Sequence, residues 1–345
     1  MQSIILAGGK GTRLLPLTIN TPKPIVPICN RPFLLYQIDM LKKAGIKDII
    51  LSLGYKPEKI EKVLGDGSDF GVNLRYVVEP EPLGTAGAFK FASQHIADTI
   101  VVLNGDSLTD LDLTEALNFH FQKKALATIV LTTVNNPSKY GLIEINKDAS
   151  IYRFVEKPRP DEITCNTVNA GIYILATEIL NLIPANQYYM FENGVFPAIL
   201  DKKLPFFAYL PENTYWQDIG TPQSYLQSHF DLMMLKLNGI SSQNFSNSNL
   251  TKEFSNSDEV SIISKDCEVE EGAIINCSSI GEKCFIGKNS YIENSVILPS
   301  SRIEGDSHIK NSIIGNHCLI EKNSKTIMRL FLGDSSKITS STFTF

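Results

Sequence analysis

Basic side chains stand among glycines near the N-terminus of the chain. The run Gly8-Gly9-Lys10-Gly11-Thr12-Arg13 directly follows the apolar residues 4–7, and Lys23 comes later between two prolines. A loop of this kind at the end of a strand presents backbone N–H groups with no Cβ in the way, so phosphates can approach closely. Arg13 offers a planar fork to phosphate oxygens, while Lys23 is a point charge that the prolines hold in place. The stretch therefore predicts a nucleotide site.

The loop matches neither of the two best-known phosphate loops. A P-loop places Lys after its second glycine, whereas Lys10 here precedes Gly11. The dinucleotide fingerprint needs a third glycine where this chain has Leu14, which disfavours a nicotinamide-dependent oxidoreductase. The remaining alternative is a glycine-rich surface turn with solvated lysines.

Two aspartates are candidates for holding a metal ion. Asp106 follows the apolar run 100–103, and Asp218 lies in the strand-like run Trp216-Gln217-Asp218-Ile219-Gly220. Two carboxylates, completed by phosphate oxygens and water, form an oxygen site that suits Mg²⁺. Each aspartate by itself also suits a turn or a helix cap. We expect Asp106 and Asp218 together to bind Mg²⁺.

The motifs along the first 220 residues resemble those of the nucleotidyltransferases that make nucleotide sugars. The shared elements are Gly-Gly-x-Gly-Thr-Arg-Leu from Gly8, Pro16-Leu17-Thr18, Pro22-Lys23-Pro24, residues 79–87, Asn104-Gly105-Asp106, Glu156-Lys157-Pro158, Asn169-Ala170-Gly171 and residues 216–220. Their order along the chain is that of the family. The resemblance is closest to the mannose-1-phosphate guanylyltransferases.

The resemblance implies a reaction between a nucleoside triphosphate and a sugar 1-phosphate that expels pyrophosphate. We expect Lys23 to bridge the α-phosphate and the sugar phosphate, and Arg13 to contact the β- and γ-phosphates. The expected catalytic residues are Arg13, Lys23, Asp106 and Asp218. The expected nucleotide contacts are Leu6, Ala7, Gly8, Gly9, Gly11, Thr12, Arg13, Glu79, Gly84 and Thr85. The expected contacts to the sugar phosphate are Gly141, Glu156, Lys157, Asn169 and Gly171, with a surface ion pair as the alternative for Glu156 and Lys157.

Glu79 favours guanine as the base. It follows the apolar run 74–78, and relatives that use thymidine or uridine triphosphates typically have glutamine at the aligned position. A carboxylate has only acceptors, which suit the two adjacent donors of guanine better than the single N–H of uracil. The alternative is that Glu79 is solvated and the backbone of residues 6–8 reads the base alone. We therefore expect a GTP-dependent enzyme that makes GDP-mannose.

Other substrates and one other class remain open at this point. A heptose-1-phosphate guanylyltransferase or a glucose-1-phosphate uridylyl- or thymidylyltransferase would keep the chemistry and change the sugar or base. A non-catalytic subunit that binds nucleotide sugars is the alternative of another class. The presence of Arg13, Lys23, Asp106 and Asp218 counts against that class.

The elements that position these residues belong to an α/β domain, which we place at residues 1–238. Short apolar runs at 4–7, 49–53, 74–78 and 100–103 alternate with amphipathic segments, including a helix expected over 86–96. This alternation favours a Rossmann-like, mostly parallel sheet covered on both faces, with ligands beyond the carboxyl ends of the strands.

A repeat follows a Ser/Asn-rich linker at 239–258. Aliphatic residues recur every six positions, with one slip of register, at Ile274, Ile280, Ile286, Ile292, Leu298, Ile303, Ile309, Ile314 and Ile320. This period indicates a left-handed parallel β-helix over 259–325, followed by a tail at 326–345; two hairpins are the alternative. His308 and His317 are the only candidate bases for an acyltransferase reading, and we favour a role in assembly or regulation.

The composition excludes several classes. A net charge of −5 argues against nucleic-acid binding, and no apolar stretch is long enough to span a membrane. No signal-peptide pattern opens the chain, so we expect a cytoplasmic protein. The six cysteines lack zinc-site spacing. Apolar residues in the tail predict a homo-oligomer formed through the β-helix or tail.

Overall fold

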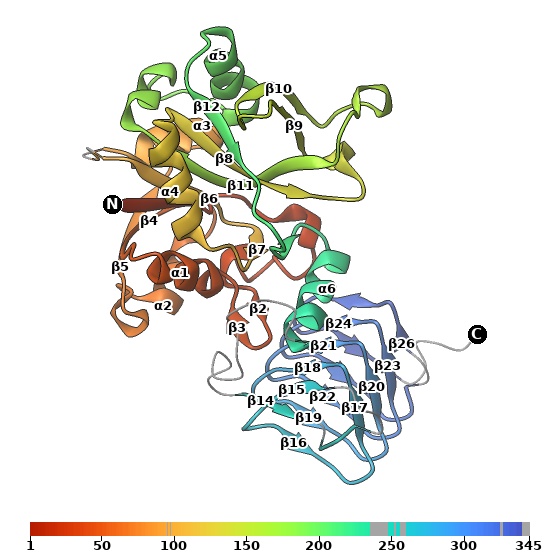
Figure 1. The fold of residues 1–345 in the computed structure, drawn as a ribbon. Coiled ribbons are helices and arrows are strands. Elements are labelled where there is room, and N and C mark those ends of the chain that lie inside the picture. Colours follow the sequence, from red (N-terminus) through yellow and green to blue (C-terminus); the bar gives the residue numbers. More distant parts are fainter. Residues whose placement is uncertain are drawn as a thin grey trace. The chain divides into compact units, whose positions relative to one another are not determined.

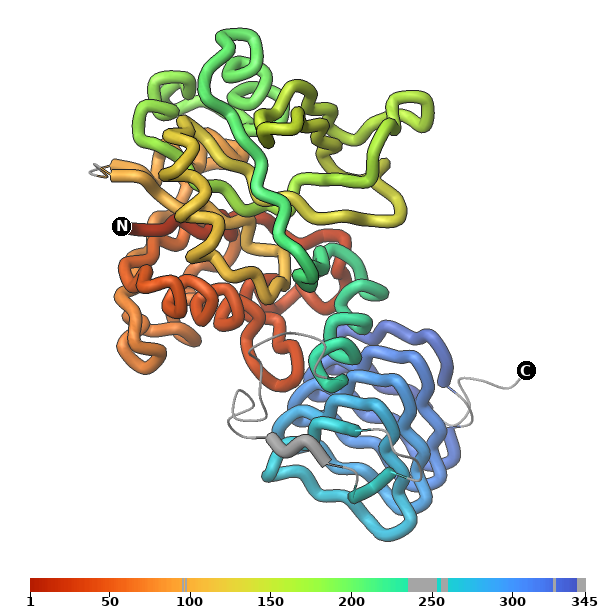
Figure 2. Tube along the Cα trace, in the orientation of Figure 1, coloured from red at the N-terminus to blue at the C-terminus, as the bar shows by residue number. Residues whose placement is uncertain are grey.

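The computed structural model describes residues 1–94, 96, 98–234, 248–251, 253–255, 260–324 and 327–339 (Figures 1 and 2). Contacts group them into two compact units. The first unit holds residues 1–9 and 36–216, and the second holds residues 10–35 and 217–339. Residues 10–35 therefore group with the C-terminal part of the chain, while the predicted domain boundaries stay a prediction.

A nine-stranded sheet forms the centre of the first unit (Figure 1). Its main path runs β10-β9-β11-β6-β1-β4-β5, and β8 pairs with β11 and β12. The four predicted strands are present and parallel: β1 (Gln2–Leu6), β4 (Asp48–Leu53), β5 (Asn73–Val78) and β6 (Ile100–Asn104). The remaining strands are β7 (Ser107–Thr109), β8 (Ala127–Thr133), β9 (Gly141–Ile145), β10 (Ile151–Glu156), β11 (Thr167–Leu175) and β12 (Phe206–Tyr209).

The sheet changes direction at β11. This strand runs antiparallel to β6, β8 and β9, and β10 is antiparallel to β9. The parallel arrangement is thus confined to β5-β4-β1-β6 and to the pair β8-β12. The four parallel strands of the main path end at the same edge, where the predicted nucleotide loop begins.

Helices bury both faces of the parallel strands. Ile4 and Ile5 point to opposite faces of β1, and both are fully buried. Residues of α3 pack into one core with Ile4 and with Phe196 of α5. The helices are α1 (Leu34–Lys43), α2 (Pro57–Leu64), α3 (Gly84–Ala92), α4 (Leu113–Lys123) and α5 (Phe196–Asp201), so the helix expected over 86–96 begins and ends earlier.

The second unit contains a parallel β-helix of three sheets (Figure 1), consistent with the predicted left-handed hexapeptide fold. One sheet holds β15 (Ser261–Ser264), β18 (Ser279–Ile280), β21 (Val296–Ile297), β24 (Ile313–Ile314) and β27 (Phe331–Leu332), with β14 (Ser248–Thr251) antiparallel at its edge. The second holds β16 (Glu268–Val269), β19 (Phe285–Ile286), β22 (Arg302–Ile303), β25 (Leu319–Ile320) and β28 (Lys337–Ile338). The third holds β17 (Ile274–Asn276), β20 (Tyr291–Glu293), β23 (His308–Lys310) and β26 (Ile327–Met328).

The coil is shorter than three full hexapeptides. Ile280 pairs with Ile297 and Ile303 with Ile320, so one coil takes 17 residues and one side of it is short. Two predicted core positions are therefore wrong: Ile275 and Ile297 belong to the core in place of Ile274 and Leu298. The apparent slip of register is the short side of each coil.

The β-helix extends beyond its predicted end at residue 325. The strands β26, β27 and β28 pair in parallel with β23, β24 and β25. The prediction of a tail from residue 326 is therefore wrong for residues 327–338, and residues 340–345 lie outside the described residues. The predicted linker lies largely outside them as well.

Small polar side chains link successive coils at the corners. The Ser261, Ser278 and Ser295 hydroxyls each accept the backbone N–H of the residue 17 positions later, at 3.1 Å. Cys284 is buried, and its thiol donates to the carbonyl oxygen of Leu298. Burial raises the pKa of the Cys284 thiol, as expected for a structural cysteine. The cysteines of the repeat thus act as small hydrogen-bonded core residues.

A helix and a short hairpin complete the second unit. The helix α6 (Pro222–Met233) packs on the hairpin of β2 (Pro27–Ile28) and β3 (Arg31–Pro32). The backbone N–H of Cys29 donates to Nδ1 of the buried His229 at 3.2 Å. Among the described residues, no helix has the length and apolar character that a membrane span requires.

Candidate functional site

The first half of the glycine-rich loop lies where β1, β4 and β6 end. The backbone N–H of Ala7 donates to the carbonyl oxygen of Ser52, and that of Gly105 donates to the carbonyl oxygen of Leu6. A Cβ on Gly54 would lie 2.9 Å from the carbonyl oxygen of Gly8. The glycines here let neighbouring strand ends pack closely. Leu6, Ala7, Gly8 and Asp106 are therefore brought to one edge of the sheet.

The carboxylate of Glu79 lies against Gly8 at this edge. A Cβ on Gly8 would lie 2.8 Å from Oε1 of Glu79. The Ser52 hydroxyl donates to Oε1 at 3.1 Å, and the backbone N–H of Leu83 donates to Oε2 at 3.1 Å. Glu79 is thus positioned from two sides and is not the freely solvated side chain of the alternative reading. Each oxygen of a carboxylate has two acceptor positions, so one remains on each.

A strap at residues 187–192 covers the start of α3. The backbone N–H groups of Ala86 and Gly87 both donate to the carbonyl oxygen of Tyr189 at 3.0 Å. Gly84 has φ +72, and a Cβ there would lie 2.6 Å from that oxygen. A Cβ on Gly87 would lie 2.6 Å from the carbonyl oxygen of Gln187. These glycines are required by the packing of the strap.

The strap also contacts Thr85. The Thr85 hydroxyl donates to Oε2 of Glu192 at 2.9 Å and accepts the backbone N–H of Phe191 at 3.0 Å. Both hydrogen bonds of the hydroxyl are therefore made within the protein. The predicted nucleotide contacts of Gly84 and Thr85 stay predictions, and the contacts that the structure gives them are to the strap.

On the sugar side, Asn169 and Gly171 form a compact group with Asn104 and Tyr173. Asn169 Nδ2 donates to the Tyr173 hydroxyl at 2.9 Å, and its Oδ1 accepts the backbone N–H of Gly171 at 2.9 Å. Gly171 has φ +75, and a Cβ there would lie 2.9 Å from Nδ2 of Asn104. The amide of Asn169 is thus oriented by two partners.

Gly141 and Glu156 face each other across β9 and β10. A Cβ on Gly141 would lie 3.1 Å from Oε2 of Glu156. Lys157 Nζ lies 3.5 Å from Oε1 of Glu156, with the two side chains 69% and 22% exposed. The predicted surface ion pair is therefore present, and an exposed pair of this kind contributes about 0–1 kcal/mol. Such a weak pair leaves both groups available to a substrate.

The second half of the loop belongs to the second unit. We call residues 10–24 the signature loop. Gly11 has φ +64, and its carbonyl oxygen accepts the hydroxyl of Thr18 at 2.9 Å. Lys23 is buried, and its Cβ would lie 3.1 Å from a Cβ on Gly11. Gly11, Lys23 and Thr18 thus form the packed base of the loop.

Arg13 projects from this base, whereas the neighbouring Thr12 is exposed. Its Nη1 lies 3.8 Å from Oδ2 of Asp218, which ends β13 (Trp216–Asp218). A Cβ on Gly220 would lie 2.7 Å from Nη2 of Arg13. The Arg13 side chain is 63% exposed and that of Asp218 17%, so water screens the pair and leaves Arg13 accessible to phosphate.

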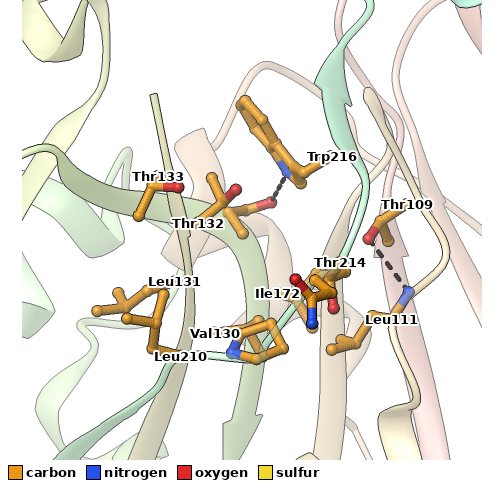
Figure 3. Close-up of a pocket in the computed structure, with 13 residues that line it drawn as sticks. Thr109, Leu111, Val130, Leu131, Thr132, Thr133, Ile172, Leu210, Thr214 and Trp216 are labelled. Atoms are coloured by element: carbon orange, nitrogen blue, oxygen red, sulfur yellow. Dashed lines mark hydrogen bonds between the residues drawn. The ribbon is translucent and has the colours of Figure 1, made fainter. Parts of the chain in front are cut away.

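A separate cavity of about 280 Å³ lies within the first unit (Figure 3). Trp216 lines it and donates its indole N–H to the carbonyl oxygen of Ala170 at 2.9 Å. Threonines and aliphatic side chains form much of the remaining wall, among them Thr109, Thr132, Thr133 and Leu131. None of the predicted site residues lines this cavity.

Comparison with known families assigns the chain. A family model described as nucleotidyl transferase matches residues 2–233, and one described as the GMPPB C-terminal domain matches residues 257–344. The chain belongs to the nucleotidyl transferase family. The family resemblance inferred from the motifs is thereby confirmed.

Two curated relatives differ in how much of this nucleotidyl transferase they match. The mannose-1-phosphate guanylyltransferase of Mycobacterium tuberculosis is 36% identical over 235 residues, which are 68% of this chain and 65% of that protein. The UTP–glucose-1-phosphate uridylyltransferase of Synechocystis is 33% identical over 329 residues, or 88% of this chain and 84% of that protein. The chain therefore matches less than two-thirds of the first relative and most of the second.

Two solved structures share the fold of the nucleotidyl transferase part. One, described as a glucose-1-phosphate thymidylyltransferase from Bacillus anthracis in complex with a sucrose, has a TM-score of 0.63 and 25% identity, and the match covers 71% of this chain and 98% of that one. The other is HddC from Yersinia pseudotuberculosis complexed with GMP-PN, with a TM-score of 0.57 and 31% identity. That match covers 67% of this chain and 99% of the other.

Nucleotidyl transferases of this family generally use a divalent metal. The predicted ligands belong to different units, Asp106 to the first and Asp218 to the second, so their pairing stays a prediction. Within the described residues no group of three or more His, Cys, Asp or Glu side chains is placed to hold a metal ion. Oδ1 of Asn104, two residues before Asp106, is buried without a hydrogen-bond partner in the described structure. An oxygen set that substrate phosphates and water complete fits these observations.

Sequence reasoning missed Glu192. It is 9% exposed and lies in a π-helical turn (Phe191–Val195) that leads into α5. Burial raises the pKa of Glu192, and also raises that of the nearby Tyr173. The only signal in the sequence was an acidic residue in the otherwise uncharged run 186–200, because its partner Thr85 is 107 positions away.

Proposed function

We propose that the protein transfers the guanylyl group of GTP to a hexose 1-phosphate, foremost mannose 1-phosphate, giving GDP-mannose and pyrophosphate. A phosphate oxygen of the sugar 1-phosphate attacks the α-phosphorus, and the bond from this phosphorus to the oxygen bridging it to the β-phosphate breaks. The attacking oxygen is already ionised, so no general base is needed. Alignment and charge neutralisation carry the reaction.

The observation that carries the choice of base is the position of Glu79. Its carboxylate lies beside Gly8 at the end of β1, oriented by Ser52 and Leu83. The remaining acceptor position on each oxygen suits the adjacent N1–H and 2-amino donors of guanine. The guanylyltransferase relative and the GMPPB-type C-terminal domain support the same choice.

The charged residues supply the remaining functions in this proposal. Lys23, fixed against Gly11, contacts the α-phosphate and the sugar phosphate, and the exposed Arg13 contacts the β- and γ-phosphates. Asp106 and Asp218 would hold Mg²⁺, which supplies charge neutralisation when it is bound. Glu156 and Asn169 accept from and donate to sugar hydroxyls, and Lys157 binds the sugar phosphate.

A second candidate is uridylyl transfer to glucose 1-phosphate. The observation in its favour is the match to the Synechocystis uridylyltransferase, which extends through most of both chains. Uracil presents one N–H between two carbonyl oxygens, and a carboxylate at position 79 repels those oxygens. The position of Glu79 therefore favours guanine over this alternative.

A grid of substrates tests the proposal. The purified protein is incubated with Mg²⁺ and each of GTP, UTP, dTTP and ATP against mannose, glucose and heptose 1-phosphates, and pyrophosphate release is measured. We expect the highest kcat/KM for GTP with mannose 1-phosphate. Activity confined to UTP or dTTP would overturn the base assignment, and binding without turnover would support the non-catalytic class. Replacing Mg²⁺ with Mn²⁺ or EDTA tests the metal.

Two further parts of the proposal concern the protein's state in the cell. We propose that it works in the cytoplasm, where nucleoside triphosphates are available, and that it self-associates through the β-helix. Met328 on β26 is 53% exposed, which supplies apolar surface for such a contact. Sedimentation velocity across a concentration series checks the second part, and a monomer at all concentrations would contradict it.

A further inference from the structure

The tip of the signature loop meets the last coil of the β-helix. Both belong to the second unit, although more than 300 positions separate them. A Cβ on Gly333 would lie 3.0 Å from Cβ of Pro16 and 3.4 Å from its Cγ. Nδ2 of Asn20 lies 3.4 Å from Oδ2 of Asp334. Pro16 and Asn20 stand between Arg13 and Lys23, so the coil contacts the stretch that joins the two cationic residues.

Asp334 is itself held by the β-helix. Its Oδ1 accepts the backbone N–H of Asn316 at 3.0 Å and the Nδ2 of the same residue at 2.8 Å. The carboxylate therefore joins the preceding coil through one oxygen and the signature loop through the other. A stacked coil is a rigid support, because each of its strands is paired with the coils on either side.

A second contact lies just beyond the signature loop. Nδ2 of Asn30 donates to the carbonyl oxygen of Ile280 at 2.7 Å. Within the loop, Thr18 closes back on Gly11. The segment that carries Arg13 and Lys23 is thus attached to the β-helix at Pro16, Asn20 and Asn30, that is, at its middle and after its end.

We infer that Gly333 and Asp334 are positioning residues for nucleotidyl transfer, and that the β-helix supports the phosphate-binding loop in addition to any role in assembly. The inference rests on the proposed function for its kinetic consequence. A glycine-rich loop samples many backbone conformations, and a displacement of about 1 Å at a reacting group can lower a rate by about a hundredfold. The turn at 333–334 restricts that sampling.

The chain contains a matched control for the experiment. Gly305-Asp306-Ser307 repeats the sequence of Gly333-Asp334-Ser335 on an inner coil. Asp306 likewise accepts from an asparagine of the preceding coil, Asn289, at 3.2 Å, and a Cβ on Gly305 would lie 3.0 Å from the Lys288 carbonyl oxygen. These printed contacts are all within the β-helix, so Asp306→Ala disturbs the stack without touching the loop.

The test compares Asp334→Ala and Gly333→Ala with Asp306→Ala and Gly305→Ala in the full chain. We expect the first pair to lower kcat/KM for the nucleotide by about tenfold, and the control pair by no more than about twofold. Asp334→Asn keeps an acceptor for Asn20 and should recover most of the loss. Amide hydrogen exchange of residues 11–23, measured without nucleotide, should be faster in Asp334→Ala than in Asp306→Ala.

The two readouts separate the inference from the proposed function. If the wild-type protein turns over none of the nucleotides while exchange in residues 11–23 still responds to Asp334→Ala, the proposed function fails and the support by the turn stands. If the wild-type protein is active and the Asp334 and Asp306 variants agree in both kcat/KM and exchange, the inference is overturned.

Discussion

Two glycine-containing loops of this protein are each held by a distant segment of the chain, yet they use glycine differently. The signature loop carries its cations outward, with Arg13 63% exposed. In the loop of residues 79–87, Gly84 and Gly87 are covered by the strap at 187–192. A glycine in a motif therefore indicates either room for a ligand or room for another part of the same chain, and only the packing distinguishes them.

The largest effect expected from breaking this comparison is in the signature loop. Lys23→Ala should lower kcat by roughly a hundred- to a thousandfold, the scale for losing one donor to transition-state charge. Lys10→Ala, at an exposed position of the same loop, is the control and should change kcat little. Steady-state kinetics with thermal melts measures both. Near-normal turnover in Lys23→Ala would remove this residue from the mechanism.

In the loop of residues 79–87, substitution of a glycine should affect folding. Gly84→Ala should lower the free energy of unfolding by about 1–3 kcal/mol more than Gly45→Ala, because its Cβ meets the strap. Gly45 has φ +78 and no atom within 4 Å of a Cβ, so it reports the cost of the left-handed backbone alone. Urea unfolding of both variants is the measurement. Equal losses would show that the strap yields to a side chain.

Base selection should change with Glu79. Glu79→Gln should reduce the preference for GTP over UTP by about ten- to a hundredfold, using the 1–3 kcal/mol typical of a bidentate base contact. Glu81→Gln, at an exposed position two residues later, is the matched control. The ratio of kcat/KM for the two nucleotides measures the effect. An unchanged ratio would assign Glu79 only to holding Ser52 and Leu83.

The two regions should respond to pH in opposite directions. Burial lowers the pKa of His229, beside the end of the 10–35 segment, to about 3, so stability there is lost as pH falls below about 6.5. The slope is about 1.4 kcal/mol per pH unit at most. Burial raises the pKa of Glu192, so the strap loses stability as pH rises above the ordinary carboxyl value.

Glutamine variants at these two positions separate the effects. His229→Gln should remove the loss of stability in acid, and Glu192→Gln should remove the loss with rising pH. Amide exchange of residues 25–35 and 187–192, corrected for the intrinsic pH dependence of exchange, reports each region separately. A change of the same sign in both variants would contradict the assignment of these groups.

The sequence by itself determined the local chemistry and the repeating part of the fold. The order of apolar runs predicted β1, β4, β5 and β6, because strand burial follows from residue type over a few positions. The order of motifs predicted the family for the same reason. The repeat predicted the β-helix, although its 17-residue coil placed the core at Ile275 and Ile297 and carried the strands past residue 325.

Tertiary structure alone decided which distant segments hold these motifs. The contact of Glu192 with Thr85 joins residues 107 positions apart, and that of Asp334 with Asn20 joins residues 314 positions apart. Neither partner follows from a periodicity or a spacing, because such contacts depend on where whole elements pack. The division of the chain, which groups residues 10–35 with the β-helix, has the same cause. Local sequence sets the conformation of a loop, and long-range packing sets what supports it.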